Sequence, residues 1–150
     1  MRHRSLRRAE LLSRLPRAFR PKLAPDQVRD LALAHVVNLD AIATGQAGEE
    51  ILWQQVGGTL TWCRVAELLG MGEPEMAEQL QLLEQVVARY RSTGRVVFTG
   101  PEYQLAKKGL QVMDLLATIV DRPTALQAAD WGELRMNEMA KPSPTPETGP

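Results

Sequence analysis

The sequence contains few of the residues that stabilise or activate small proteins by special chemistry. Its 150 residues include one cysteine, Cys63, so no disulfide can form within the chain. Three tryptophans, two tyrosines and two phenylalanines are the only aromatic side chains apart from histidine. No apolar run approaches the roughly 20 residues that a membrane span requires. We therefore expect a cytoplasmic protein without a membrane-spanning segment.

Motifs that mark an enzyme are absent as well. The chain has no glycine-rich nucleotide-binding loop, no G-x-S-x-G nucleophile motif and no Glu-x-x-His pair for a metal. His35 lies on the apolar face of an expected helix, and we interpret it as a hydrogen-bonded core residue. We interpret Cys63 as a small buried side chain. These features predict a non-enzymatic protein with no catalytic residue, no cofactor and no bound metal.

Charge is segregated along the chain. The whole sequence has 18 basic and 18 acidic residues, so its net charge is zero. Residues 1–22 hold eight of the basic residues against one acid, Glu10, which places +7 on this segment and −7 on residues 23–150. We divide the chain into a basic N-terminal arm (1–24), a helical domain (25–140) and a proline-rich tail (141–150) that is expected to be disordered.

Three interpretations of the basic arm stay open. It binds the phosphates of a nucleic acid, it is a solvated tail, or it lies on its own acidic body as an autoinhibitory or dimer-swapping element. We expect a short helix at residues 5–15. Its four apolar positions are Leu6, Leu11, Leu12 and Leu15. The candidate nucleic-acid contacts of the chain are Arg2, Arg4, Arg7, Arg8, Arg14, Arg95, Lys107 and Lys108.

Apolar residues recur every three or four positions through most of the helical domain, which predicts helices. We expect them at about 26–44, 49–69, 74–93, 101–120 and 124–139, separated by breaks that contain glycine or proline. The fold class is mainly α, a compact bundle of about five helices with one short strand or hairpin near 95–105.

Two of these helices carry further expectations. In the helix at 26–44, Leu33, Val36 and Val37 widen the apolar stripe, so we expect burial on more than one side. In the segment 49–69, Gly57-Gly58 either lets another helix pack closely or divides the segment into two helices.

Part of the helical domain resembles winged-helix regulators of the MarR type. Residues 62–70 (WCRVAELLG) are similar to the second helix of a helix-turn-helix, residues 75–90 to its third helix and residues 95–99 to a wing strand. The segment 105–109 (LAKKG) is similar to the sequence that follows the wing.

The resemblance implies a DNA-binding transcriptional regulator with a winged-helix-like portion. By this resemblance Arg95 contacts DNA from the wing, and Gln79 and Gln81 read bases from the third helix. The start of that helix departs from the pattern, because its three glutamates, Glu73, Glu75 and Glu78, would oppose phosphates.

The sequence favours a small protein-binding or regulatory protein that acts through an unidentified protein partner, with the winged-helix-like DNA-binding regulator as the alternative. The candidate protein interface is the acidic side of the helix at 74–93 together with a tryptophan expected to be exposed. Its residues are Glu75, Glu78, Glu84 and Trp131. A narrow apolar seam in residues 76–90 predicts a homodimer interface if the bundle leaves it uncovered. The seam residues are Met76, Leu80, Leu83 and Val87.

Overall fold

A computed structural model describes residues 21–140 as a bundle of five helices. In chain order they are α2 (Pro25–Ala43), α3 (Glu49–Leu69), α4 (Glu73–Thr93), α5 (Gly100–Ile119) and α6 (Arg122–Ala140). Each expected helix of the domain is present, with ends within two residues of the prediction. The helix predicted at 5–15 and the tail at 141–150 lie outside the described residues. None of the five described helices has the length and apolar character that crossing a membrane requires.

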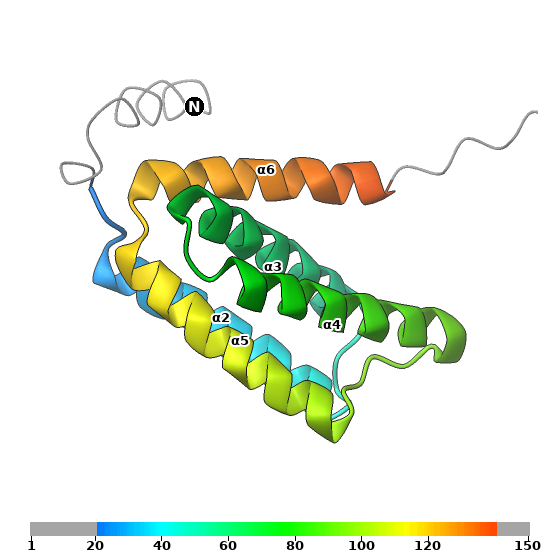
Figure 1. Ribbon diagram of the computed structural model, residues 1–150. Coiled ribbons are helices and arrows are strands. Elements are labelled where there is room, and N and C mark those ends of the chain that lie inside the picture. Colours follow the sequence, from blue (N-terminus) through cyan, green and yellow to red (C-terminus); the bar gives the residue numbers. More distant parts are fainter. Residues whose placement is uncertain (1–20, 141–150) are drawn as a thin grey trace, which may run out of the picture.

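The helices form three layers with α3 at the centre (Figure 1). Helices α2 and α5 lie side by side in one layer, α3 and α4 form the next, and α6 lies along α3 on the far side. Helix α3 therefore packs against all four other helices. A helix in this position has to bury nearly its whole circumference.

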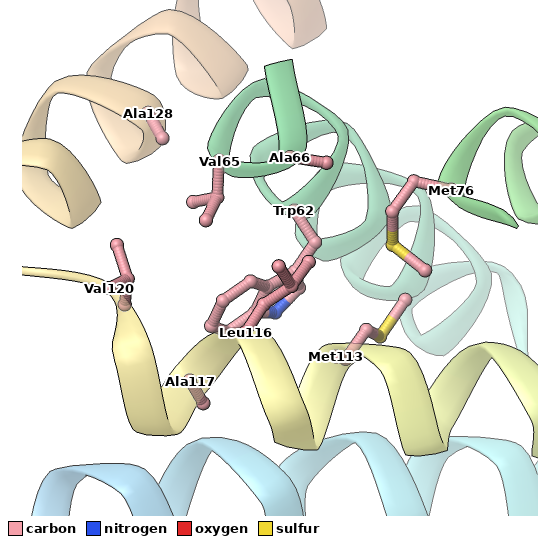
Figure 2. Close-up of a cluster of buried hydrophobic side chains, with 9 residues drawn as sticks. All are labelled: Trp62, Val65, Ala66, Met76, Met113, Leu116, Ala117, Val120 and Ala128. Atoms are coloured by element: carbon pink, nitrogen blue, oxygen red, sulfur yellow. The ribbon is translucent and has the colours of Figure 1, made fainter. Parts of the chain in front are cut away.

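Three apolar clusters fill the bundle, and the two larger ones lie at opposite ends of α3; the third joins Leu39, Leu82 and Ala106. Trp62 and Val65 of α3 share the first cluster with Met113 and Leu116 of α5 (Figure 2). The second cluster uses the preceding half of α3. Its buried members are Ile42, Leu52, Val56, Leu60, Leu83, Val86 and Val96.

The apolar seam of α4 is covered within the chain. Met76 is buried in the first cluster and Leu83 in the second. Leu80 and Val87 are half-buried against the second cluster. The seam therefore contributes to the core of one chain.

The prediction of a strand at 95–99 is wrong. These residues connect α4 to α5, and residues 21–140 contain no strand, only an isolated bridge between Lys22 and Asp121. Val96 is buried in the second cluster, and the carbonyl of Val97 accepts a hydrogen bond from Arg89 Nη1 at 2.8 Å. The run of apolar residues thus reflects a connection that closes the end of the bundle. The winged-helix-like portion lacks its wing in the described part of the chain.

Helix α3 continues through its two adjacent glycines as one helix, and one of the two marks close packing with another helix. A Cβ atom added to Gly58 would lie 2.8 Å from Cε1 of His35 on α2. A Cβ atom added to Gly57 would lie 3.6 Å from Cγ of Met136 on α6, which is an ordinary contact. Of the two glycines, only Gly58 is needed for space.

We predict opposite effects for alanine at these two neighbours. Gly58→Ala should lower the free energy of unfolding by about 1–3 kcal/mol, since the buried imidazole of His35 has to move. Gly57→Ala should raise it by up to about 1 kcal/mol, because alanine favours the helix. Urea unfolding of both variants measures the difference. Equal effects would show that α2 does not approach α3 this closely.

Candidate functional site

Helix α2 carries apolar side chains on two sides and buries only one. The buried side holds His35, Leu39 and Ile42. On the other side Leu33 is 57% exposed, Val36 45% and Val37 56%. These three residues, at positions i, i+3 and i+4, share one face, which we name the α2 outer face. The expectation that they are buried is wrong, and this face is the candidate site.

Hydrogen bonds of His35 determine which side of α2 faces the core. Nε1–H of Trp62 donates to Nε2 of His35 at 3.0 Å. The indole nitrogen can only donate, so Nε2 is the acceptor and Nδ1 carries the proton. Nδ1–H then donates to Oε1 of Gln55 at 3.2 Å. The neutral ring uses both nitrogens while its edge lies against Gly58.

A different rotation of α2 would break these bonds. Consecutive helix residues point about 100° apart, so turning Val36 into the core would turn His35 away from Trp62 and Gln55. Each buried polar group left without a partner costs about 1–3 kcal/mol. The polar contacts to α3 therefore hold the α2 outer face toward solvent.

Acidic side chains lie at both ends of the α2 outer face. Asp40 follows Val36 by four positions and Val37 by three, so it extends the same face. Asp26 and Asp30 lie at the start of the helix, where Arg29 is 3.6 Å from one and 3.7 Å from the other. Within residues 21–140 Asp40 takes part in no salt bridge closer than 4 Å. The face combines an apolar centre with an acidic border.

The predicted acidic interface lies on α4, away from this face. Glu75, Glu78 and Glu84 are all exposed. Glu78 borders an open groove between α4 and the start of α5. The groove is lined by Glu78, Gln81, Leu82, Gln85, Pro101, Glu102 and Leu105.

The predicted nucleic-acid contacts fall in two regions. Arg2, Arg4, Arg7, Arg8 and Arg14 lie outside the described residues. Arg95 is exposed in the α4–α5 connection, while Lys107 and Lys108 are exposed on α5. Lys107 Nζ lies 4.7 Å from the ring centroid of Tyr103.

Gln79, expected to read bases, is buried instead. Its amide donates to the carbonyl of Leu105 at 2.8 Å. Its side chain fills the space beside Gly109, where a Cβ atom would overlap it. Gln81 is exposed. The polar residue at 79 therefore joins α4 to α5.

Trp131, expected to be an exposed anchor, is half-buried on α6 against the second cluster. Its ring centroid lies 5.6 Å from the guanidinium carbons of both Arg64 and Arg135. Arg64 also pairs with Glu67 at 2.8 Å, and Arg135 pairs with Glu138 at 3.2 Å. Part of its aromatic surface is therefore already in contact within the chain.

An ion pair that the sequence analysis missed joins α4 to α5. Arg89 binds the carboxylate of Glu102 with two hydrogen bonds, of 2.8 and 3.0 Å. These bonds hold the pKa of Glu102 below its usual value. Glu102 also accepts the backbone N–H of Thr99 at 2.7 Å, which forms a capping box at the start of α5. The spacing Thr-x-x-Glu before an apolar run was the available signal.

The described residues offer little reactive chemistry. Burial raises the pKa of the Cys63 thiol to about 11, and this thiol donates to the carbonyl of Met76 at 3.4 Å. Among residues 21–140, no three His, Cys, Asp or Glu side chains gather in a way that could hold a metal ion.

Comparisons with protein-family models, with curated proteins and with solved structures find no match for this chain. No residue role is therefore transferred from a relative. The α2 outer face and its acidic border stand on the geometry alone.

We predict that His35 makes stability depend on pH. Burial lowers its pKa below the usual 6.5, although the hydrogen bond to Gln55 and the charge of Asp114 oppose this shift. Between the two pKa values the unfolded chain binds a proton that the folded chain does not. The free energy of unfolding should thus be highest above pH 6.5 and fall by up to about 1.4 kcal/mol per pH unit below it. Urea unfolding between pH 5 and 7.5 measures this slope, and His35→Gln should flatten it. An unchanged slope in the variant would contradict the assignment.

We also predict that Cys63 reacts slowly in the folded protein. A thiol with a pKa of about 11 has about 100-fold less thiolate near neutral pH than one at the ordinary 9.0. The rate of reaction with a disulfide reagent at pH 8 should therefore be at least about 100-fold lower in buffer than in concentrated urea. Similar rates in both solutions would mean that the thiol is accessible and ionisable.

Proposed function

We propose that this chain is a small non-enzymatic regulatory protein that binds a partner protein through the α2 outer face. The exposure of Leu33, Val36 and Val37 beside a fully formed core carries the proposal. Clustered exposed apolar side chains with a polar border are typical of interaction sites.

The shape and charge of the face favour a basic amphipathic helix as the partner element. Three aliphatic side chains over little more than one turn match the contact row of a single crossing helix. Residues 21–140 carry ten basic and sixteen acidic side chains, a net charge of −6. Basic residues beside the apolar row of the partner would meet Asp26, Asp30 and Asp40 and accelerate association.

The size of the α2 outer face limits the affinity with which it can bind a partner. Burying the exposed halves of three aliphatic side chains contributes about 3 kcal/mol. Micromolar affinity requires about 8 kcal/mol. Further contacts are needed, and the predicted residues, Glu75, Glu78 and Glu84 on α4 and Trp131 on α6, remain proposed as additional contacts with a partner protein.

We predict that a photo-crosslinking amino acid at Val37 captures a discrete partner in the native cell. The matched control is Leu115 on α5, which is also 56% exposed and apolar but lies outside the α2 outer face. Crosslinked products that form from position 37, do not form from position 115, and disappear when Leu33→Lys is added would support the proposal. Equal crosslinking from both positions would show that exposure alone causes it.

DNA binding is the alternative function. Anisotropy of labelled duplex DNA, at about 50 and 200 mM salt, separates the two functions. Tight DNA binding combined with no crosslink from Val37 would replace the proposed function by the regulator alternative. The acidic start of α4, with Glu73 and Glu75 in its first turn, opposes that alternative.

A further inference from the structure

We propose that residues 5–15 of the same chain form a helix that packs antiparallel on the α2 outer face. This segment would act as an internal substitute for the partner helix, which has to displace it. That regulatory role rests on the proposed function, whereas the packing itself does not.

The apolar pattern of the segment is the reverse of the pattern on α2. Leu11, Leu12 and Leu15 have spacings of one and three residues, and Leu33, Val36 and Val37 have spacings of three and one. In an antiparallel pair one register therefore aligns all three contacts. The pairs are Leu15 with Leu33, Leu12 with Val36 and Leu11 with Val37.

The same register brings opposite charges together. It places Arg8 beside Asp40, one turn beyond the apolar contacts on each helix. Residues 1–20 carry seven arginines against Glu10, while residues 21–140 have a net charge of −6. Charge complementarity thus favours packing of the arm on its own body.

The chain leaves the described bundle at the correct end of α2. The carbonyl of Pro21 accepts the backbone N–H of Arg122 at 2.7 Å, and Lys22 bridges to Asp121. These contacts fix the exit point at the start of α2, beside the α5–α6 junction (Figure 1).

The connecting residues are long enough for this arrangement. Leu15 would lie over Leu33, about 12 Å along α2 from its first residue. The two helix axes would be about 8–10 Å apart. Because Pro21 is held at the exit point, residues 16–20 make the connection, and the six steps from Leu15 to Pro21 span up to about 20 Å when extended. Pro16 and Pro21 keep this connection from continuing as a helix.

Two α2 outer faces in contact explain the surface less well. A stable dimer buries about 800 Å² on each partner, and three aliphatic side chains supply a small part of that area. An isolated helix of eleven residues is marginal in water. The segment would therefore gain its helix by docking, and the α2 outer face would gain a cover.

The test is disulfide trapping in the full chain. Arg8→Cys is combined with Asp40→Cys, or with Asp26→Cys as the matched control on the same helix. Both aspartates are exposed, and Cys63 stays a spectator because its pKa is about 11. Rates of disulfide formation under limiting oxidant are followed by mass spectrometry without reduction, which separates links within one chain from links between two.

A docked arm and a free arm predict opposite orders for the two rates of disulfide formation. In a free arm the shorter loop closes more readily, so residue 8 would react with residue 26 at least as fast as with residue 40. Docking should make the pair 8–40 at least about tenfold faster than 8–26, through the higher effective concentration. Adding Val36→Lys should remove this advantage. A faster 8–26 pair, or links mainly between two chains, would overturn the inference.

The outcome is separable from that of the proposed function. Fast 8–40 trapping without any partner crosslink from Val37 would leave the docking and remove the partner. A partner crosslink with slow 8–40 trapping would leave the partner and remove the docking. If both hold, the oxidised 8–40 protein should lose the partner crosslink, and deletion of residues 1–20 should increase it.

Discussion

The approach of α2 to α3 at Gly58 is the constraint on which the rest of the arrangement depends. Helix α3 contacts every other helix, so its neighbours are positioned by what its surface allows. At Gly58 that surface leaves room for one imidazole ring, and Trp62 and Gln55 supply the matching donor and acceptor. His35 thereby fixes both the distance and the rotation of α2. A leucine at 35 would bury as much surface without selecting one rotation so strongly.

This selection connects the core to the surface. Helix α2 has enough apolar residues to cover two sides, and the polar contacts of His35 commit one side to the bundle. The remaining side, with Leu33, Val36 and Val37, is exposed. In the two proposals above, the arm and a partner protein would use the same row of contacts, so one surface would serve both binding and its control. The charge segregation of the chain fits these proposals, because a basic segment would meet an acidic border in either case.

The sequence predicted the helices well because each is periodic and ends at a break. It placed His35 on the buried side of α2 correctly but also expected the second apolar side to be buried. Periodicity reports apolar character, whereas the choice between two apolar sides depends on Gln55 and Trp62, on another helix. The strand at 95–99 was predicted wrongly because an apolar connection over a bundle end looks like a short strand. For the site, the sequence indicated His35 as a core residue but expected Leu33, Val36 and Val37 to be buried. Gln79 was wrongly expected to be exposed. Its burial depends on the space beside Gly109 on another helix, which the sequence around residue 79 does not indicate.

The state of the His35 ring tests the central claim most directly. Nitrogen-15 NMR of the imidazole at pH 7.5 reports which nitrogen carries the proton, and nuclear Overhauser effects report what lies beside Hε1. We expect a neutral ring with the proton on Nδ1 and a strong effect between Hε1 of His35 and the α protons of Gly58. A proton on Nε2, or no effect to Gly58, would mean that α2 is rotated or displaced and that its outer face is not the one described.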